Sequence, residues 1–255
     1  MNAPSVSLQS LPGLPIVKPG DNLASLIVAS LNTAAIALLE GDILVVTSKI
    51  VSKAEGRFLD LRTVTPGDRA QEIAGITGKD PRMVEVVLQE SEDVSRIAFN
   101  VLVTRHKLGF TSANAGIDHS NVGPNGEDWI LLLPVDPDAS AAKLRDGLRR
   151  LTGASVGIVI SDTHGRPHRM GNIGVGIGAA GLPALYDMRG MTDLFGRVLQ
   201  ATVIGLADEL AAAADLLSGQ AAEGRPVTLI RGLKLPPIEG RARDLIRPPE
   251  LDLYR

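Results

Sequence analysis

The sequence predicts an α+β fold, and three observations favour it over a Rossmann fold or a P-loop fold. Helical and strand-like segments intermix along the 255 residues without the regular strand-helix-strand order of a doubly wound sheet. The pattern G-x-x-x-x-G-K-[ST] is absent. A G-x-G-x-x-G pattern at Gly176, Gly178 and Gly181 follows a polar segment and precedes Leu182-Pro183, whereas the dinucleotide fingerprint follows a strand and opens a helix.

Composition narrows the functional classes. Apolar residues make up 44% and aromatic residues only 3%, so the core must be built from Ala, Val, Ile and Leu. The net charge of −3 argues against a nucleic-acid-binding protein, and the lack of Cys excludes disulfides and thiolate chemistry. No signal peptide and no apolar run of the roughly 20 residues that span a bilayer is recognisable. We therefore expect a cytoplasmic protein with one large domain or two small ones and no membrane partner.

The first third of the chain predicts a loop, a helix and a buried strand. Residues 1–20 are expected to form an N-terminal loop, because prolines interrupt them. Asp21-Asn22 caps a helix from about 23 to 39, and 43–46 is a buried strand. Two hydroxyls and two lysines follow this strand in residues 47–53. They form either a phosphate-binding segment or a solvated connector, and the sequence leaves both open.

Two helices and two strands are expected next. Thr65-Pro66-Gly67-Asp68 predicts a helix to about 76, with Thr65 as its N-cap, and Asp80-Pro81 starts another to about 88. Residues 94–99 and 101–104 are predicted strands. The polar segment 111–123, which contains Asp118 and Asn121, is typical of a turn when read alone. A second acidic segment later in the chain favours a functional role for it.

The central prediction is an apolar strand that ends in a polar loop. Residues 129–135 form a strand, and Asp138 caps a helix to about 151 whose buried stripe is Ala142, Leu144, Leu148 and Leu151. The apolar run 154–160 then leads into 161–171, which holds a carboxylate, a hydroxyl, two histidines and two arginines. A carboxylate beside a hydroxyl suits a hard cation such as Mg²⁺, and arginines suit phosphate or carboxylate.

The remaining segments predict a close-packed strand, a helix and two further strands. Glycines alternate with Val175 and Ile177, which indicates a strand that meets another backbone closely. Residues 198–204 and 226–231 are predicted strands. The helix 207–217 should bury Leu206, Leu210, Ala213, Ala214 and Leu217. Gln220 and Glu223 follow it and, read alone, indicate a helix C-cap region. The segment 235–255 is rich in Pro and Arg and is expected either to dock on the body or to be partly mobile.

The polar residues predict an oxygen-ligand metal site. Asp118, Asp162 and Thr163 together would form a cage for Mg²⁺ or Mn²⁺, which bridges nucleotide phosphates in phosphoryl transfer. Neither G-x-S-x-G nor H-E-x-x-H is present. The four histidines, His106, His119, His164 and His168, lack the spacing of a zinc site.

Five segments in order carry a resemblance to one family. They are Leu14-Pro15, the run 47–57 (TSKIVSKAEGR), the run 114–122 (NAGIDHSNV), the run 161–167 (SDTHGRP) and the run 219–224 (GQAAEG). Together they closely resemble the coenzyme F420-0:L-glutamate ligase family over residues 11–233. The resemblance implies a single ligase domain spanning 1–255, with two intertwined lobes and mixed or antiparallel sheets. Some members carry a fused nitroreductase-like domain, which we do not expect here.

The resemblance also implies an activity and a set of site residues. Members use GTP to join L-glutamate to the lactyl carboxylate of F420-0, with Mg²⁺ or Mn²⁺ and an additional K⁺, and they form homodimers. The implied metal ligands are Asp118, Asp162, Thr163 and Gln220. The implied contacts to the guanine nucleotide are Leu14, Pro15, Ser48, Lys53 and Asn121. An acyl-phosphate route requires no covalent protein nucleophile. His164 is expected to be scaffold only.

Some details stay open. Arg166 and Arg169 carry charge suited to substrate phosphate or carboxylates. Where many members have an aromatic residue and a more polar run, this chain has His168, Met170, Asn172 and Ile173, which affects substrate contacts more than metal binding. The alternatives are a nucleotide-dependent glutamyl ligase acting on another carboxylic acid, and a catalytically silent nucleotide-binding regulatory protein. Retention of all four implied metal ligands disfavours the silent protein.

Overall fold

The computed structural model describes residues 3–123 and 126–252 and is built around one five-stranded sheet. The strand order is β1-β12-β2-β8-β9. Only the central pair, β2 and β8, is parallel, and the other three pairings are antiparallel. The strands are β1 (Ser7–Ser10), β2 (Ile43–Thr47), β8 (Gly157–Arg166), β9 (Arg169–Ala180) and β12 (Val227–Arg231). The expected α+β class with mixed and antiparallel sheets is confirmed.

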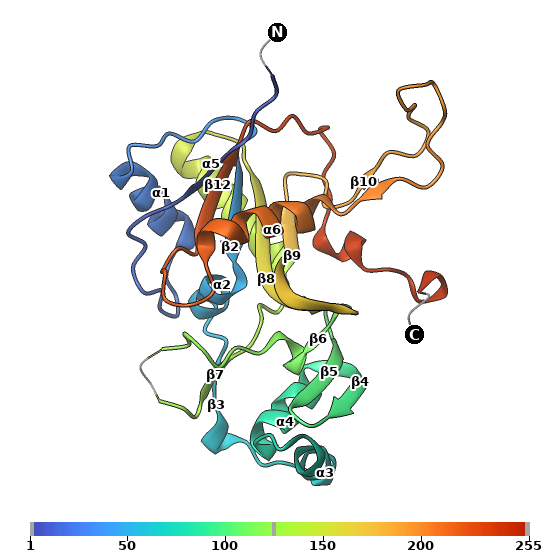
Figure 1. Cartoon of the computed structure of the whole chain (residues 1–255). Coiled ribbons are helices and arrows are strands. Elements are labelled where there is room, and N and C mark those ends of the chain that lie inside the picture. Colours follow the sequence, from blue (N-terminus) through green and yellow to red (C-terminus); the bar gives the residue numbers. More distant parts are fainter. Residues whose placement is uncertain (1–2, 124–125, 253–255) are drawn as a thin grey trace.

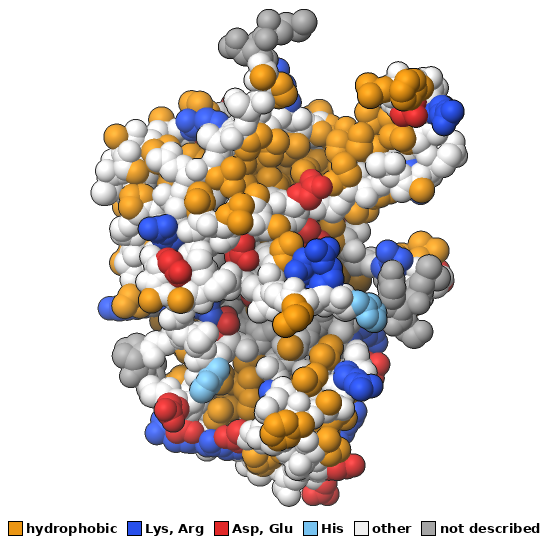
Figure 2. Space-filling model, viewed as in Figure 1, with side chains coloured by type: hydrophobic (Ala, Val, Ile, Leu, Met, Phe, Trp, Pro, Cys, Tyr) orange, Lys and Arg blue, Asp and Glu red, His pale blue; other side chains and the backbone are white. Residues whose placement is uncertain are grey.

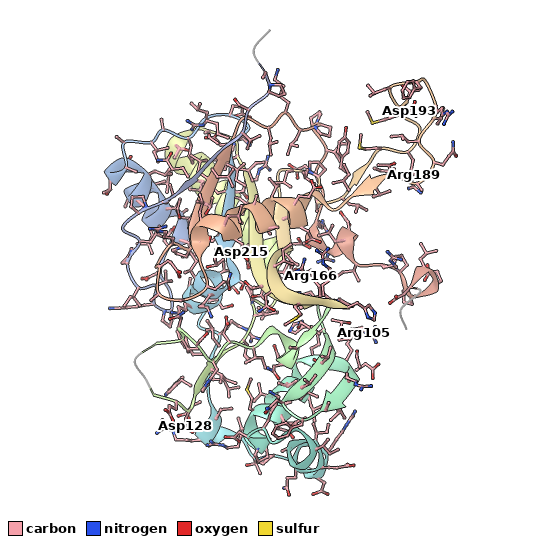
Figure 3. The ribbon with its side chains drawn as sticks, viewed as in Figure 1. Arg105, Asp128, Arg166, Arg189, Asp193 and Asp215 are labelled. Carbon is pink, nitrogen blue, oxygen red and sulfur yellow. The ribbon has the colours of Figure 1, made fainter. Side chains whose placement is uncertain are left out.

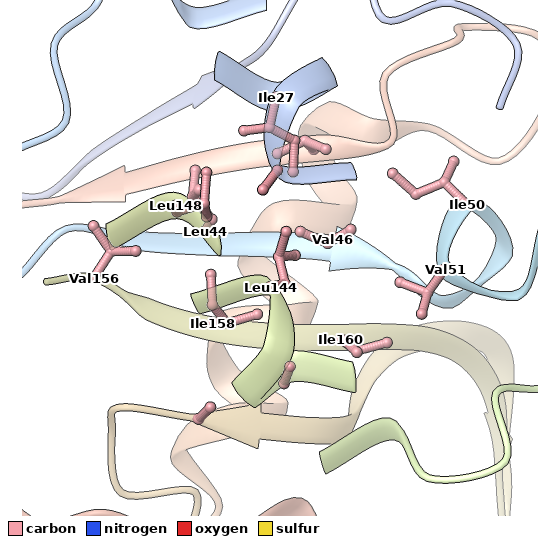
Figure 4. Close-up of a cluster of buried hydrophobic side chains, with 14 of the residues drawn as sticks. Ile27, Leu44, Val46, Ile50, Val51, Leu144, Leu148, Val156, Ile158 and Ile160 are labelled. Carbon is pink, nitrogen blue, oxygen red and sulfur yellow. The ribbon is translucent and has the colours of Figure 1, made fainter. Parts of the chain in front are cut away.

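Helices cover both faces of this sheet (Figure 1). α1 (Leu23–Thr33) and α5 (Pro137–Thr152) pack against each other, and α5 packs on β8 and β9. α6 (Leu206–Ser218) packs on β9, β8 and β12 and belongs to a second apolar cluster with Val45 and Val159. The first cluster places Leu44, Val46, Ile158 and Ile160 against α1 and α5 (Figure 4). The central strands are therefore buried on both faces, as apolar runs without alternation predict.

A smaller lobe lies between β2 and β8 in sequence and below the main sheet in Figure 1. Its own apolar cluster is formed by α3, α4, β5 and the short 3₁₀ turn 114–116. The elements of the lobe are β3 (Phe58–Asp60), α3 (Asp68–Thr77), α4 (Pro81–Gln89), β4 (Ser91–Ala98), β5 (Val101–His106), β6 (Thr111–Ala113) and β7 (Trp129–Leu131). The β4-β5-β6 sheet meets the main body where β6 contacts β8.

An arm and a C-terminal segment complete the fold. β10 (Tyr186–Asp187) and β11 (Val203–Ile204) pair at the base of an arm that projects from the main body (Figure 1). The tip of the arm exposes Leu194 and Phe195, which are 99% and 88% exposed. After β12, the 3₁₀ helix Ala242–Leu245 packs on β9. No helix of the described residues is long and apolar enough to cross a membrane.

Three expectations for the N-terminal part were wrong. Residues 7–10 form β1 instead of loop, because their backbone pairs with β12. Asn22 caps α1 as expected, but the helix ends at Thr33, where Ala35 adopts a left-handed φ of 54°. Residues 48–54 form a helix, α2 (Ser48–Ala54), so the solvated connector is wrong, while phosphate binding by this segment stays a prediction.

Two helix starts also differ from the expectation. α3 begins at Asp68 with Gly67 as its N-cap, so Thr65 is not the cap. α5 begins at Pro137, and the carboxylate of Asp136 accepts the Ala139 amide as the N-cap. Asp138 instead accepts the backbone amides of Ala179 and Ala242 and joins three elements. On α5, Ala142 and Leu151 face solvent while Ala141 is buried.

The largest difference concerns residues 161–171. They were expected to form a loop, but β8 continues to Arg166 and turns directly into β9. The strand pairing supplies the backbone partners that a polar loop would lack. The predicted close-packed glycine strand is confirmed as part of β9. The strands predicted at 129–135 and 198–204 are much shorter, at 129–131 and 203–204, and Ala213 and Leu217 of α6 are only partly buried.

Candidate active site

The site begins where β2 ends beside β8, at the last pair of their parallel ladder. Thr47 pairs with Ser161 at this edge, so the residues that follow, Ser48 and Asp162, are neighbours. Ser48 is only 2% exposed, and its hydroxyl donates a hydrogen bond to Asp162 Oδ1 at 3.3 Å. Ligand sites in sheets with parallel strands form at such carboxyl ends. The local sequence explains the arrangement, because each apolar run stops at a hydroxyl residue.

Asp118 joins this pair from the smaller lobe. Its backbone makes two hydrogen bonds to Leu131, each of 2.9 Å, which fix its position. Burial raises the pKa of the Asp118 carboxyl, the Lys49 ammonium opposes that effect, and the Asp162 carboxylate adds to the rise. Lys49 Nζ lies 2.6 Å from Asp118 Oδ1. The two carboxylates therefore repel each other, and the Lys49 ammonium offsets part of that repulsion.

Two lysines of α2 hold the loop that carries Asp118. Lys49 Nζ donates to the Ser120 carbonyl at 3.0 Å, and Lys53 Nζ donates to the Asn121 carbonyl at 2.7 Å. The pKa of Lys53 is lowered, first by burial and next by the charge of Lys49. The Asn121 amide in turn donates to the Ala221 carbonyl at 2.8 Å, although the two residues are far apart in sequence. The predicted residues Lys53 and Asn121 are thus in contact, and Ser48 lies on the same helix as Lys53.

Leu14 and Pro15 lie on the segment between β1 and α1. Its first residue, Leu11, donates its amide to Val227 of β12, and its Gly20 amide donates to Ala54 of α2. The segment therefore runs from the end of the 219–226 loop to α2. Leu14 packs at the border of the apolar cluster shared with α1. The proximity of Leu14-Pro15 to the site therefore stays a prediction.

Thr163 and Gln220 occupy the other side of β8. Because side chains alternate along a strand, Thr163 faces opposite to Asp162 and His164, on the α6 face that Val159 also faces. Gln220 follows α6 and its Nε2 donates to Asp215 Oδ1 at 2.8 Å. Burial raises the pKa of Asp215, and the charge of Asp162 raises it further. Asp118 and Asp162 thus lie together on one face of β8. Thr163 lies on the opposite face, against which α6 packs, and Gln220 follows that helix.

Sequence reasoning missed two neighbours of Asp162. His164 was assigned to scaffold, but its Nε2 lies 3.0 Å from Asp162 Oδ2. Asp215 was not singled out, although its spacing from Ala207 and Ala211 places it on the helix face that meets the glycine strand. Figure 3 shows Asp215 near the end of α6 and Arg166 on the β8–β9 hairpin. Lys49 belonged to a quoted motif, but no role was derived for it.

An aromatic stack connects the carboxylates to the smaller lobe. The Phe110 ring lies 4.8 Å from the His164 ring and 5.3 Å from the His106 ring, measured between centroids. Burial, assisted by Lys107 and Arg57, lowers the pKa of His106 to about 4. His106 Nδ1 accepts the Leu108 amide at 2.9 Å, so the neutral ring carries its proton on Nε2.

The lowered pKa of His106 predicts that the free energy of unfolding decreases in acid. Between pH 7 and pH 5 the unfolded chain protonates His106 near pH 6.5, while the folded chain protonates it only near pH 4. Stability must therefore fall as the pH falls through this window, by about 1–2 kcal/mol from this group. The variant His106→Asn keeps an acceptor for the Leu108 amide but does not titrate. We expect its free energy of unfolding, measured in urea at pH 7 and pH 5, to fall by about 1–2 kcal/mol less than that of the unmutated protein. Equal declines in both proteins would contradict the expectation.

The tip of the β8–β9 hairpin carries positive charge. Arg166 Nη2 donates to the Met170 carbonyl at 3.0 Å, while its Nε is buried without a partner. Arg169 is exposed, and His168 at the turn has a φ of 59°. The charge suits an anionic substrate group.

The donors at the site fit a hard cation. They are carboxylate, hydroxyl and amide oxygens, which Mg²⁺ and Mn²⁺ prefer. Among residues 3–123 and 126–252, no three His, Asp or Glu side chains gather closely enough to hold a metal alone. Two carboxylates with substrate phosphates are a common Mg²⁺ arrangement, so a bound nucleotide would complete the coordination. The ammonium of Lys49 against Asp118 indicates that this place accepts positive charge.

Comparisons with known proteins agree on one family. A family described as "F420-0:Gamma-glutamyl ligase" matches residues 13–232. The chain is 45% identical over 253 residues to the "Coenzyme F420:L-glutamate ligase" of Methanothermobacter thermautotrophicus, covering 98% of this chain and 99% of that protein. It is 45% identical over 256 residues to the protein of the same name from Methanopyrus kandleri, covering 99% and 98%. The protein of that name from Archaeoglobus fulgidus is 44% identical over 95% of this chain and 94% of its own length.

Proposed function

Because the chain belongs to the F420-0:gamma-glutamyl ligase family, we propose that it joins L-glutamate to coenzyme F420-0 in F420 biosynthesis, with GTP as the energy source. Membership makes the chain a ligase that forms carbon-nitrogen bonds. The observation that carries the proposal is the meeting of Asp118 and Asp162 beside Ser48, where β2 ends next to β8. GTP as the nucleotide is part of the proposal.

The proposed reaction has two steps. A carboxylate oxygen of F420-0 attacks the γ-phosphorus of GTP, GDP leaves, and an acyl phosphate forms. The amino group of glutamate then attacks the acyl carbon, inorganic phosphate leaves, and the nitrogen loses a proton. The first step is needed because a carboxylate has no adequate leaving group. Such transfer depends on positioning and charge neutralisation more than on protein nucleophiles, and we assign none.

Each residue group has a role in that scheme. Leu14, Pro15, Ser48, Lys53 and Asn121 are proposed to contact the nucleotide. Asp118, Asp162, Thr163 and Gln220 are proposed to hold Mg²⁺ or Mn²⁺, with K⁺ as an additional ion. When bound, the metal would neutralise negative charge on the phosphates. Lys49 and Lys53 reach the same side of the site and hold its loop. Arg166 and Arg169 are proposed to attract the phosphate or carboxylate groups of the acceptor.

Two features of the product and assembly belong to the same proposal. After the first amide bond, further γ-linked glutamates can follow if the product is rebound as an acceptor.

A homodimer is proposed as well. It is supported by the arm between β10 and β11, whose apolar tip stands away from the body (Figure 2). A monomeric mass in light scattering at micromolar concentration would remove the dimer from the proposal.

One assay tests the function directly. Purified protein with GTP, Mn²⁺, L-glutamate and F420-0 should yield GDP and a product heavier by one or more glutamyl residues in mass spectrometry. Omitting F420-0 should abolish glutamyl transfer. Transfer to a different carboxylic acid alone would indicate another glutamyl ligase. GTP binding without product on any acceptor would indicate a silent nucleotide-binding protein, and either result would contradict the proposal.

A further inference from the structure

The glycines of β9 determine where α6 places its polar end. A Cβ on Gly176 would lie 2.8 Å from the Ala207 Cβ, and one on Gly174 would lie 2.5 Å from the Ala211 carbonyl oxygen. Helix and strand therefore touch at these two points. Ala207, Ala211 and Asp215 are four residues apart, so they share one face of the helix. Asp215 is the next residue of this contact stripe, and Thr163 is the strand partner of Gly174.

The contact between Asp215 and Gln220 fixes the orientation of an amide. Asp215 Oδ1 accepts from Gln220 Nε2 at 2.8 Å. A carboxylate can only accept a hydrogen bond, so it selects the nitrogen of the amide group. The Gln220 carbonyl oxygen must then point away from Asp215. Without Asp215, both orientations of the amide would be available, and one of them presents an NH₂ group where a cation requires oxygen.

We propose that Asp215 is a positioning residue that holds the carbonyl oxygen of Gln220 toward the cation site beside Thr163. The inference rests on the proposed function, because that function makes Gln220 a metal ligand. Asp215 acts through Gln220 and is not itself a ligand. Its role resembles that of other carboxylates that orient metal-binding side chains, whose loss weakens metal binding by about 10-fold to 100-fold.

Direct metal binding separates the possible roles of Asp215. The measurement is the dissociation constant of Mn²⁺ in the presence of GDP, taken from electron paramagnetic resonance of free Mn²⁺. We expect Asp215→Ala to weaken binding by about 10-fold. Asp215→Asn should stay within about 3-fold, because the asparagine oxygen can still accept from Gln220 in one of two amide orientations, and halving the competent population costs only about 2-fold. Glu209→Ala, an exposed position on the same helix, is the matched control and should leave binding unchanged.

A double-mutant cycle tests the path through Gln220. The variant with both Asp215→Ala and Gln220→Ala should bind Mn²⁺ no more weakly than Gln220→Ala alone, since a positioning residue has nothing left to orient. Additive losses would overturn the proposal, as would an Asp215→Asn loss equal to that of Asp215→Ala, which marks a direct ligand. Thermal melting of each variant reports whether the fold is intact.

Failure of the proposal and failure of the proposed function give different results. Mn²⁺ binding to the unmutated protein that Asp215→Ala leaves unchanged would overturn the positioning role alone. No Mn²⁺ binding to the unmutated protein, with or without GDP, would overturn the metal site and the positioning role together. If Asp215→Ala does not fold, Asp215→Asn and Gln220→Ala decide the matter. A clear loss of Mn²⁺ binding in Gln220→Ala with a change within about 3-fold in Asp215→Asn would support the positioning role, and equal losses in both variants would overturn it.

Discussion

Asp162→Asn should reduce glutamyl transfer by about 100-fold to 1000-fold while the protein remains folded. Asp162 lies at the centre of the site, since Ser48, His164, Asp118 and Asp215 all interact with its carboxylate. The amide of asparagine keeps the shape and can still accept from Ser48. It removes the negative charge that a metal and its phosphates require. The loss should therefore appear in kcat and in metal affinity more than in stability.

Steady-state rates at saturating GTP and Mn²⁺, together with thermal melting, check this expectation. Asp146→Asn is a suitable control, because Asp146 is an exposed carboxylate on α5 away from the site. An unchanged rate for Asp162→Asn would remove Asp162 from the metal site. A rate loss accompanied by loss of the folded transition would show only that the charge supports folding.

Gly174→Ala should destabilise the fold by about 2–3 kcal/mol. Alanine normally stabilises a strand position by reducing the entropy of the unfolded chain, by about 0.4–1 kcal/mol. At Gly174 the added Cβ would lie 2.5 Å from the Ala211 carbonyl oxygen, and that atom belongs to helix backbone. The helix must move away from the sheet, because a backbone carbonyl cannot change rotamer. The steric cost exceeds the entropic gain, and the Asp215 and Gln220 pair moves with the helix.

Urea unfolding measures this effect, and the chain contains a matched control. Gly75 lies inside α3, and a Cβ there meets nothing within 4 Å. Gly75→Ala should be neutral or stabilise by up to about 1 kcal/mol. If the two variants have equal stability, the tight contact between β9 and α6 does not limit the position of the helix.

The same glycine strand shows how far sequence reasoning reached. The pattern around Val175 and Ile177 predicted a strand that meets another backbone, and β9 does meet α6. The partner could not be predicted, because no local pattern tells which helix will approach. The prediction of a loop at 161–171 was wrong for a related reason. Polar side chains there indicated loop, but β8 and β9 satisfy each other's backbone groups and continue as strand.

The sequence by itself determined the family, the buried strands and the chemical types at the site. Apolar runs in β2 and β8 predicted buried strands because such runs need burial on both faces, and the motifs around Asp118 and Asp162 predicted oxygen ligands. Tertiary structure alone decided which residues meet. It placed Thr47 beside Ser161, brought Asp118 in from the smaller lobe, and put Asp162 and Thr163 on opposite faces of one strand. It also added His164 and Asp215 to the neighbourhood of Asp162. These contacts join residues distant in sequence or fix the direction of a side chain, and both depend on how strands and helices pack.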